Sequence, residues 1–158
     1  MAEDRPKRVA LIASQGTLDG AYPPLIIAST AVAMDMEVGI FFTFYGLNII
    51  NKKKYKNLKV SPVGNPAMPV SIPNFVSAMP GMTAMATMMM KSWLKQAGTA
   101  TVPELIEACI EFDVRLIACQ MTLEVMKIKR EDLIDGIEVG GAATFLEYAS
   151  DADITLFM

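Results

Sequence analysis

The stretch RVALIAS, Arg8–Ser14, opens the unit that decides the fold. It is a short apolar run that ends in polar and Gly residues, which is typical of a buried strand. Ala21–Asp35 follows at helical length, and EVGIFFTF, Glu37–Phe44, is β-branched and aromatic like a second buried strand. Strand, helix and strand in this order predict a βαβ unit with parallel strands and a right-handed crossover.

The rest of the chain continues this alternation after a long insertion. Residues 51–97 are irregular and rich in Lys, Pro and Met, and within them Met82–Ala97 is a helix candidate. Further strands are predicted at Val114–Ala118, Ile137–Val139 and Ile154–Met158, with helical segments between them. The pattern predicts one domain, residues 1–158, with a three-layer α/β sandwich and a mainly parallel five-stranded sheet. We expect the flavodoxin-like strand order 2-1-3-4-5.

Composition excludes several classes of function. The chain has 14 basic and 17 acidic residues, a net charge of −3, which argues against direct nucleic-acid binding. It contains no histidine, so one chain cannot build a Ser-His-Asp triad, a Cys-His pair or a histidine metal site. We expect neither a metal nor another cofactor. The apolar runs are too short for a signal peptide or a membrane span, which predicts a cytoplasmic protein with reduced cysteines.

The expected strand order places a cysteine in the binding crevice. Ligands of open parallel sheets bind outside the carboxyl ends of the strands, where the strand order reverses. Cys119 follows the third predicted strand, and Thr122 is a plausible N-cap of the helical residues after it. A helix N-terminus would favour the thiolate. The residues expected around Cys119 are Gln15, Gly16, Thr43, Tyr45, Gly46, Gln120, Met121, Thr122, Gly140 and Gly141.

Each of these features also has a plain structural interpretation. From its position alone, Cys119 is as well explained as a small hydrophobic residue that ends a buried strand as it is by a functional thiol. Cys109 falls on the apolar side of a predicted helix, so a core position is favoured over a second functional thiol. A disulfide between the two exceeds the reach of the predicted geometry. The Met cluster at 79–90 indicates a flexible core or interface face rather than a Cu(I) site, and a lid is a third possibility.

Several segments together resemble the DsrE/DsrF-like sulfurtransferase family, in its DsrE-like branch that is sometimes labelled peroxiredoxin-like. They are GIFFTFYGL at 39–47, IACQMT at 117–122, LIDG at 133–136, GGAA at 140–143 and ADITLF at 152–157. The resemblance covers nearly the whole chain. It departs at Lys127, where family members often have glycine.

The resemblance implies a function for Cys119. A cysteine at this position would accept sulfane sulfur as a persulfide or thiosulfonate and relay it to a partner thiol. Such proteins assemble as trimers or hexamers, and TusA-like or rhodanese-like sulfur carriers would be the partners. Two other functions stay open: a non-catalytic oligomeric interaction subunit, and a small-molecule binder at the switch point of the sheet.

Overall fold

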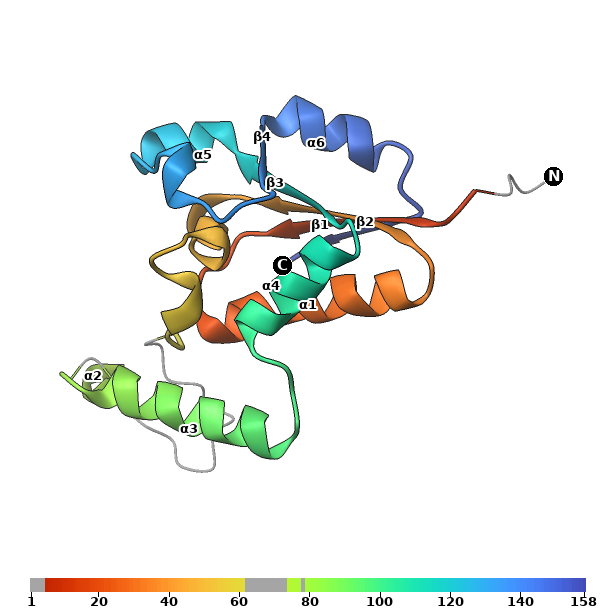
Figure 1. The fold of residues 1–158 in the computed structure, drawn as a ribbon. Helices are drawn as coiled ribbons and strands as arrows, with labels where there is room; N and C mark the ends of the chain where they lie inside the picture. Colours follow the sequence, from red (N-terminus) through yellow and green to blue (C-terminus); the bar gives the residue numbers. More distant parts are fainter. Residues whose placement is uncertain (1–4, 62–73, 78) are drawn as a thin grey trace.

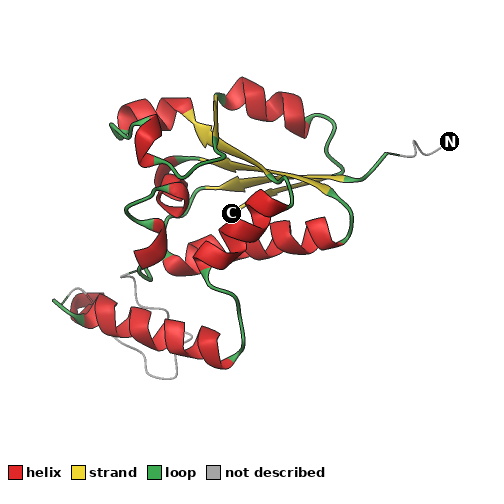
Figure 2. Cartoon of the chain, viewed as in Figure 1, coloured by secondary structure: helices red, strands yellow, loops and turns green. Residues whose placement is uncertain are grey.

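The computed structural model describes residues 5–61, 74–77 and 79–158, which form a sheet with helices on both faces (Figures 1 and 2). The strands are β1 (Arg8–Ala13), β2 (Glu37–Phe42), β3 (Arg115–Cys119), β4 (Glu138–Gly140) and β5 (Ile154–Phe157). The helices are α1 (Leu18–Ala33), α2 (Asn74–Ser77), α3 (Met82–Gln96), α4 (Val102–Glu111), α5 (Gln120–Val125) and α6 (Ala142–Ala149). The 3-10 turns are η1 (Phe44–Ile50), η2 (Tyr55–Asn57) and η3 (Arg130–Asp132). This arrangement confirms the predicted α/β class.

The strand order differs from the predicted one. The sheet is parallel with the order β4-β3-β2-β1-β5, so β2 lies between β1 and β3. The expected order 2-1-3-4-5, which made β1 and β3 neighbours, is wrong. The runs of β1, β2 and β3 are all nearly continuously apolar, as in strands covered on both faces. Their burial pattern therefore does not indicate which of them is central.

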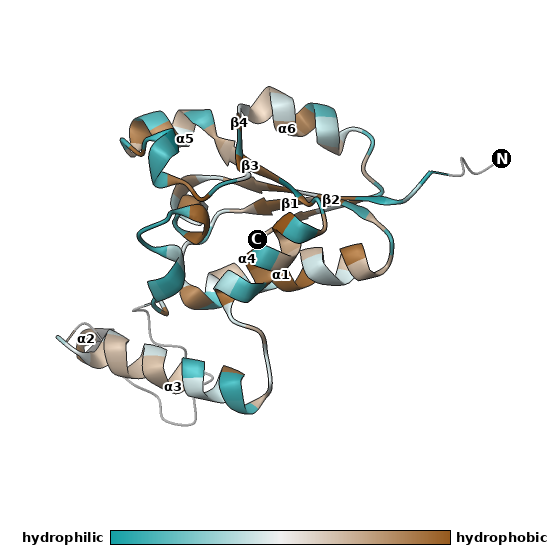
Figure 3. Ribbon diagram, viewed as in Figure 1, coloured by the Kyte–Doolittle hydropathy of each residue, from teal (hydrophilic) through white to brown (hydrophobic). Residues whose placement is uncertain are grey.

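Along β1, β2 and β3, side chains alternate between two cores, one on each face of the sheet. Figure 1 shows α6 above the sheet and α1 and α4 below it, and Figure 3 shows that the strands carry strongly hydrophobic residues. In β3, Leu116 and Ala118 belong to the core beside α1 and α4, whereas Ile117 and Cys119 belong to the core beside α6. The alternation of β3 therefore fixes the Cys119 side chain on the α6 side.

The Met-rich helix α3 packs against the core beside α1 and α4 through Met90, which is partly buried. Figure 1 shows α2 and α3 below α1, away from the sheet. Within α3 only Thr87 is buried, and its hydroxyl accepts a hydrogen bond from the Val60 amide at 3.1 Å. Met85 and Met88 are 59% and 73% exposed. A core face is therefore the wrong interpretation of Met85 and Met88, and an interface or a lid stays a prediction for them. The part of the insertion at 62–73 lies outside the described residues.

The helix that follows Cys119 ends in a strained position. Lys127 has a φ of 52°, in the left-handed region that favours glycine. Its amide donates to the Glu124 carbonyl at 3.2 Å, and the Ile128 amide donates to the Leu123 carbonyl at 2.9 Å. These two bonds form a Schellman motif, in which the left-handed residue closes the helix. The backbone thus explains why glycine suits the Lys127 position.

Candidate functional site

Cys119 joins β3 to α5 at the carboxyl end of the sheet. It is the last residue of β3, where it pairs in register with Gly140 of β4, and it is also the N-cap residue of α5. The predicted N-cap at Thr122 is wrong, because Thr122 is the third residue of the helix. The Cys119 residue is 5% exposed, and it packs among the apolar residues beside α6.

The chain leaves β3 and β4 toward opposite faces of the sheet. After β3, Leu123 of α5 is buried in the core beside α1 and α4, whereas after β4, Phe145 of α6 is buried in the other core. Diverging exits of neighbouring strands define a topological switch point. The expected switch point between strands one and three does not exist, because those strands are not neighbours. Cys119 and the Gly140-Gly141 pair instead flank a switch point between β3 and β4.

A hydroxyl pair links the exit of β2 to the helix after Cys119. The hydroxyls of Thr43 and Thr122 lie 3.2 Å apart, and the Phe44 amide donates to the Thr122 hydroxyl at 3.2 Å. Phe44 has a φ of 46°, a costly conformation for an aromatic residue. Thr122 is 1% exposed, so its hydroxyl has no access to water as an alternative partner. The sequence pattern placed Thr43 and Thr122 near Cys119 but did not predict this bond.

Replacing Thr122 with valine is expected to lower the free energy of unfolding by about 1 kcal/mol, because it removes the part-buried hydrogen bond from the Phe44 amide. Thr122→Ser is the matched control, since it keeps the hydroxyl and should cost less. Urea unfolding followed by circular dichroism measures both proteins. A valine variant as stable as the wild type would show that the bond does not hold Phe44.

The other predicted neighbours of Cys119 divide into two groups. Gln15 and Gly16 follow β1, which is separated from β3 by β2, so they do not flank the cysteine strand. Gly16 and Gly46 instead allow the two loops to touch, because a Cβ on Gly16 would lie 2.0 Å from the Tyr45 carbonyl oxygen. Gln120 and Met121 do follow Cys119 directly. The Gln120 amide donates to Glu124 at 3.1 Å, and Met121 is 52% exposed.

The second cysteine lies on the opposite face of the sheet. Cys109 of α4 is 1% exposed and belongs to the core beside α1 and α4, whereas Cys119 belongs to the core beside α6. Both thiols are free, as the predicted distance required. Burial raises the pKa of the Cys109 thiol from 9.0 to about 11, because an apolar core disfavours the thiolate. Cys109 is therefore protonated and shielded at neutral pH.

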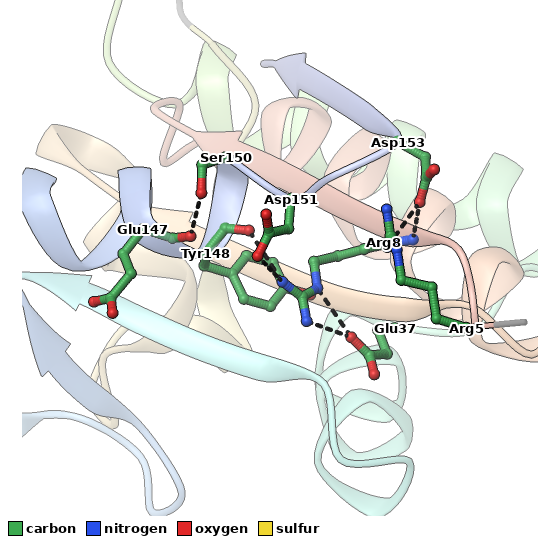
Figure 4. Close-up of polar contacts among 8 residues, drawn as sticks. All are labelled: Arg5, Arg8, Glu37, Glu147, Tyr148, Ser150, Asp151 and Asp153. Atoms are coloured by element: carbon green, nitrogen blue, oxygen red, sulfur yellow. Dashed lines mark hydrogen bonds and ion pairs between the residues drawn. The ribbon is translucent and has the colours of Figure 1, made fainter. Parts of the chain in front are cut away.

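A second polar cluster, which the sequence analysis missed, lies at the amino end of the sheet (Figure 4). The Tyr148 ring lies 4.8 Å and 5.5 Å from the guanidinium carbons of Arg8 and Arg115. These are distances at which cation–π attraction is expected. Glu37 accepts from Arg8 at 2.9 Å, and Glu138 accepts from Arg115 at 2.8 Å. The arginines are thus neutralised by carboxylates, and the cluster has no surplus positive charge for an anion.

The phenol of this cluster is buried without a hydrogen-bond partner among the described residues. Tyr148 packs directly over Gly39, where a Cβ would lie 2.4 Å from the ring. Burial raises the pKa of Tyr148 to about 12, although the nearby Arg8 opposes this shift. Gly39 within GIFFTFYGL therefore makes room for an aromatic ring of α6.

The described residues contain neither a membrane-spanning helix nor a cluster of metal ligands. None of their helices combines the length and hydropathy needed to cross a bilayer. They also contain no group of three or more Cys, Asp or Glu side chains arranged to hold a metal ion. What they do contain is a parallel sheet with a cysteine at the exit of an inner strand, which defines a thiol-bearing α/β protein.

The chain belongs to the DsrE/DsrF/DrsH-like family, whose model matches residues 5–157. This membership confirms the resemblance seen in the sequence. The chain is 48% identical to the sulfur carrier protein DsrE2 of Allochromatium vinosum, over 96% of this chain and 98% of that protein. It is 32% identical to the uncharacterized protein YrkE of Bacillus subtilis, over 98% and 99% of the two chains.

A solved structure with the same fold is the YchN protein of E. coli. Its TM-score is 0.59, and the match covers 96% of this chain and 99% of that one at 12% sequence identity. At this identity the likeness establishes the fold alone.

Proposed function

We propose that this protein is a sulfur carrier that accepts sulfane sulfur on Cys119 and passes it to a thiol of a partner protein. The observation that carries the proposal is the contrast between the two cysteines. Both are buried, but Cys119 lies at a strand exit beside the switch point, whereas Cys109 lies within a helix that covers the opposite core and has a raised thiol pKa. The 48% identity with a protein named as a sulfur carrier supports the same role.

The chemistry needs only a thiolate. The Cys119 thiolate attacks the outer sulfur of a donor R–S–SH, the donor S–S bond breaks, and R–S⁻ leaves with the electron pair. Cys119 then carries –S–SH, and the leaving thiolate takes a proton from water, with no net oxidation. If the donor is a tetrathionate, the central S–S bond breaks, Cys119 receives the –S–SO₃⁻ group and thiosulfate leaves. Delivery to a partner thiol is the reverse of loading.

The proposal includes the partners of this exchange, its cellular location and the oligomeric state of the protein. The partners would be TusA-like or rhodanese-like carriers, and the protein would act in the cytoplasm as a homotrimer or homohexamer. Because Cys119 is 5% exposed in one chain, loading requires a local movement that uncovers the sulfur. The helix α5, which follows Cys119 and has six residues, is the element whose local opening would uncover the sulfur.

Intact mass spectrometry after incubation with polysulfide or tetrathionate tests the proposal. The wild type and Cys109→Ala are expected to gain an adduct that reductant removes, and Cys119→Ser is expected to gain none. Cys109→Ala is the matched control because it removes the other thiol. Loading that persists in Cys119→Ser would move the chemistry away from Cys119, and an unloaded wild type would contradict the carrier role.

The second candidate is a non-catalytic subunit that assembles through α3. Its supporting observation is the exposed apolar face of that helix, where Met85, Met88 and Trp93 are 45–73% exposed. In this case Cys119 would be a structural residue of the α6 core. A Cys119 that resists alkylation and sulfur donors in the folded protein, together with a Met88→Glu variant that dissociates the assembly, would favour this function.

A further inference from the structure

Charge is distributed unevenly along the chain. The segments 44–60 and 120–137, which follow β2 and β3, contain eight Lys or Arg and four Asp or Glu residues, a net charge of +4. The rest of the chain contains six basic and thirteen acidic residues, a net charge of −7, which together give the −3 of the whole chain. The two segments that follow β2 and the Cys119 strand are therefore basic, and the remainder of the sequence is acidic.

The two basic segments lie side by side. Asn51 forms an isolated antiparallel bridge with Leu133, and the Lys52 amide donates to the Asp132 carbonyl at 2.8 Å. Three of the four carboxylates there are neutralised by nearby lysines: Lys53 pairs with Asp132, Lys52 with Asp135 and Lys129 with Glu131.

Five exposed cations remain without a carboxylate at ion-pair distance among the described residues, and we call them the basic rim. They are Lys54, Lys56, Lys59, Lys127 and Arg130. The surplus positive charge is thus exposed to solvent and is not neutralised by carboxylates of the described residues.

An apolar patch accompanies the basic rim. Phe44 and Tyr45 of η1 are 53% and 66% exposed, and Met121 and Val125 of α5 are 52% and 67% exposed. Met121 and Val125 are four residues apart and so share one face of the helix. The bond from the Phe44 amide to the Thr122 hydroxyl joins the two elements. An exposed aromatic and Met patch with charges around it is typical of a protein interface, and a small anion would need no such patch.

We propose that this end of the molecule docks an acidic protein segment that bears the exchanging cysteine, with Phe44, Tyr45, Met121 and Val125 as the contact and the basic rim as the steering charge. The inference rests on the proposed sulfur-carrier function. It names the chemistry of the partner: carboxylates around the reactive thiol and an apolar residue beside it. Association should therefore be fast at low ionic strength and slow in salt, since exposed charges are screened beyond the Debye length.

Two persulfide-bearing peptides of equal length provide the probe. Each has one cysteine persulfide and one leucine; the first has four glutamates around them, and the second has glutamines instead. Sulfur transfer to Cys119 is followed by quenched-flow mass spectrometry. For the wild type, the second-order rate constant with the glutamate peptide is expected to be about tenfold higher at low salt, and the difference should largely vanish in about 0.5 M NaCl.

Two charge-matched variants locate the effect. Lys54→Glu/Lys127→Glu changes one residue of each basic segment and should remove the tenfold preference. Lys91→Glu/Lys95→Glu makes the same change in net charge on α3 and should keep the tenfold preference for the glutamate peptide. Circular dichroism confirms that both fold. Equal rates for the two peptides, or an equal loss in both variants, would overturn the docking surface.

The remaining outcomes separate this inference from the function on which it rests. Transfer from neither peptide to wild-type Cys119 would refute the carrier function itself, whereas equal transfer from both would refute only the acidic partner. If Lys54→Glu/Lys127→Glu instead abolishes a salt-sensitive self-association in sedimentation, the surface is occupied by a second copy of this chain. That result would also overturn the proposal.

Discussion

The Gly46→Ala protein is expected to lose about 3 kcal/mol or more of stability, because no room exists for a methyl group between two backbone segments. A Cβ on Gly46 would lie 2.0 Å from the Ala13 carbonyl oxygen and 2.8 Å from its carbonyl carbon. These atoms belong to the end of β1, where the Thr43 amide donates to the same Ala13 oxygen at 3.0 Å. The contact cannot be relieved by rotating a side chain.

The loss should appear as a fall in Tm of about 10 °C in thermal unfolding, given the size of the chain. Gly141→Ser is the matched control: a Cβ there meets nothing within 4 Å, and serine is a favoured N-cap residue for α6. The control should therefore be as stable as the wild type. If Gly46→Ala were equally stable, the close approach between the exits of β1 and β2 would be refuted.

The parts of the fold that follow from local pattern were predictable. The strand at 8–13 and the helix ending at Glu111 follow from an apolar run and from the Thr101 to Glu104 capping box, in which the Thr101 amide donates to the Glu104 carboxylate at 2.6 Å. The order of the strands was not predictable, because it depends on long-range pairing. The Arg115 to Glu138 ion pair joins two such strands, but nothing in the sequence links these residues.

The candidate site was predictable in its centre and not in its surroundings. A cysteine at the end of an apolar run lies at the carboxyl edge of a parallel sheet whatever the strand order. The position of Cys119 could therefore be predicted from its own strand alone. Its neighbours depend on which strand lies next to β3, and for this reason Thr43 lies close to the cysteine helix while Gln15 does not flank the cysteine strand. The strained φ of Phe44 leaves no trace in the sequence, since glycine would be the usual residue there.

Alkaline pH is expected to destabilise this protein through two buried acids. Folding raises the pKa of Cys109 from 9.0 to about 11 and that of Tyr148 from 10.0 to about 12, in both cases mainly through burial. In the window between the unfolded and folded pKa values the folded state binds more protons, so stability falls as pH rises. The contribution of each group is complete below its unfolded pKa and is lost on passing through its folded pKa.

By pH 11, linkage gives a loss of about 2 kcal/mol for Cys109 and about 1 kcal/mol for Tyr148 relative to pH 8. Urea unfolding of the wild type, Cys109→Ala and Tyr148→Phe between pH 8 and pH 11 measures these two losses. In each variant the free energy of unfolding should fall less steeply with pH than in the wild type, by the amount given for the residue that was replaced. Tyr45→Phe is the control, because that ring is exposed to water in the folded state.

The pH dependence of the stability of Cys109→Ala has a direct consequence for the sulfur chemistry. A shallower slope means that the wild-type core holds Cys109 as a protonated thiol until the fold itself weakens, and a protonated thiol does not attack a sulfane donor. In that case Cys109 is excluded from exchange at neutral pH, in agreement with the proposed role of Cys119. An unchanged slope would show that Cys109 ionises freely in the folded protein, and both cysteines would then compete for sulfur.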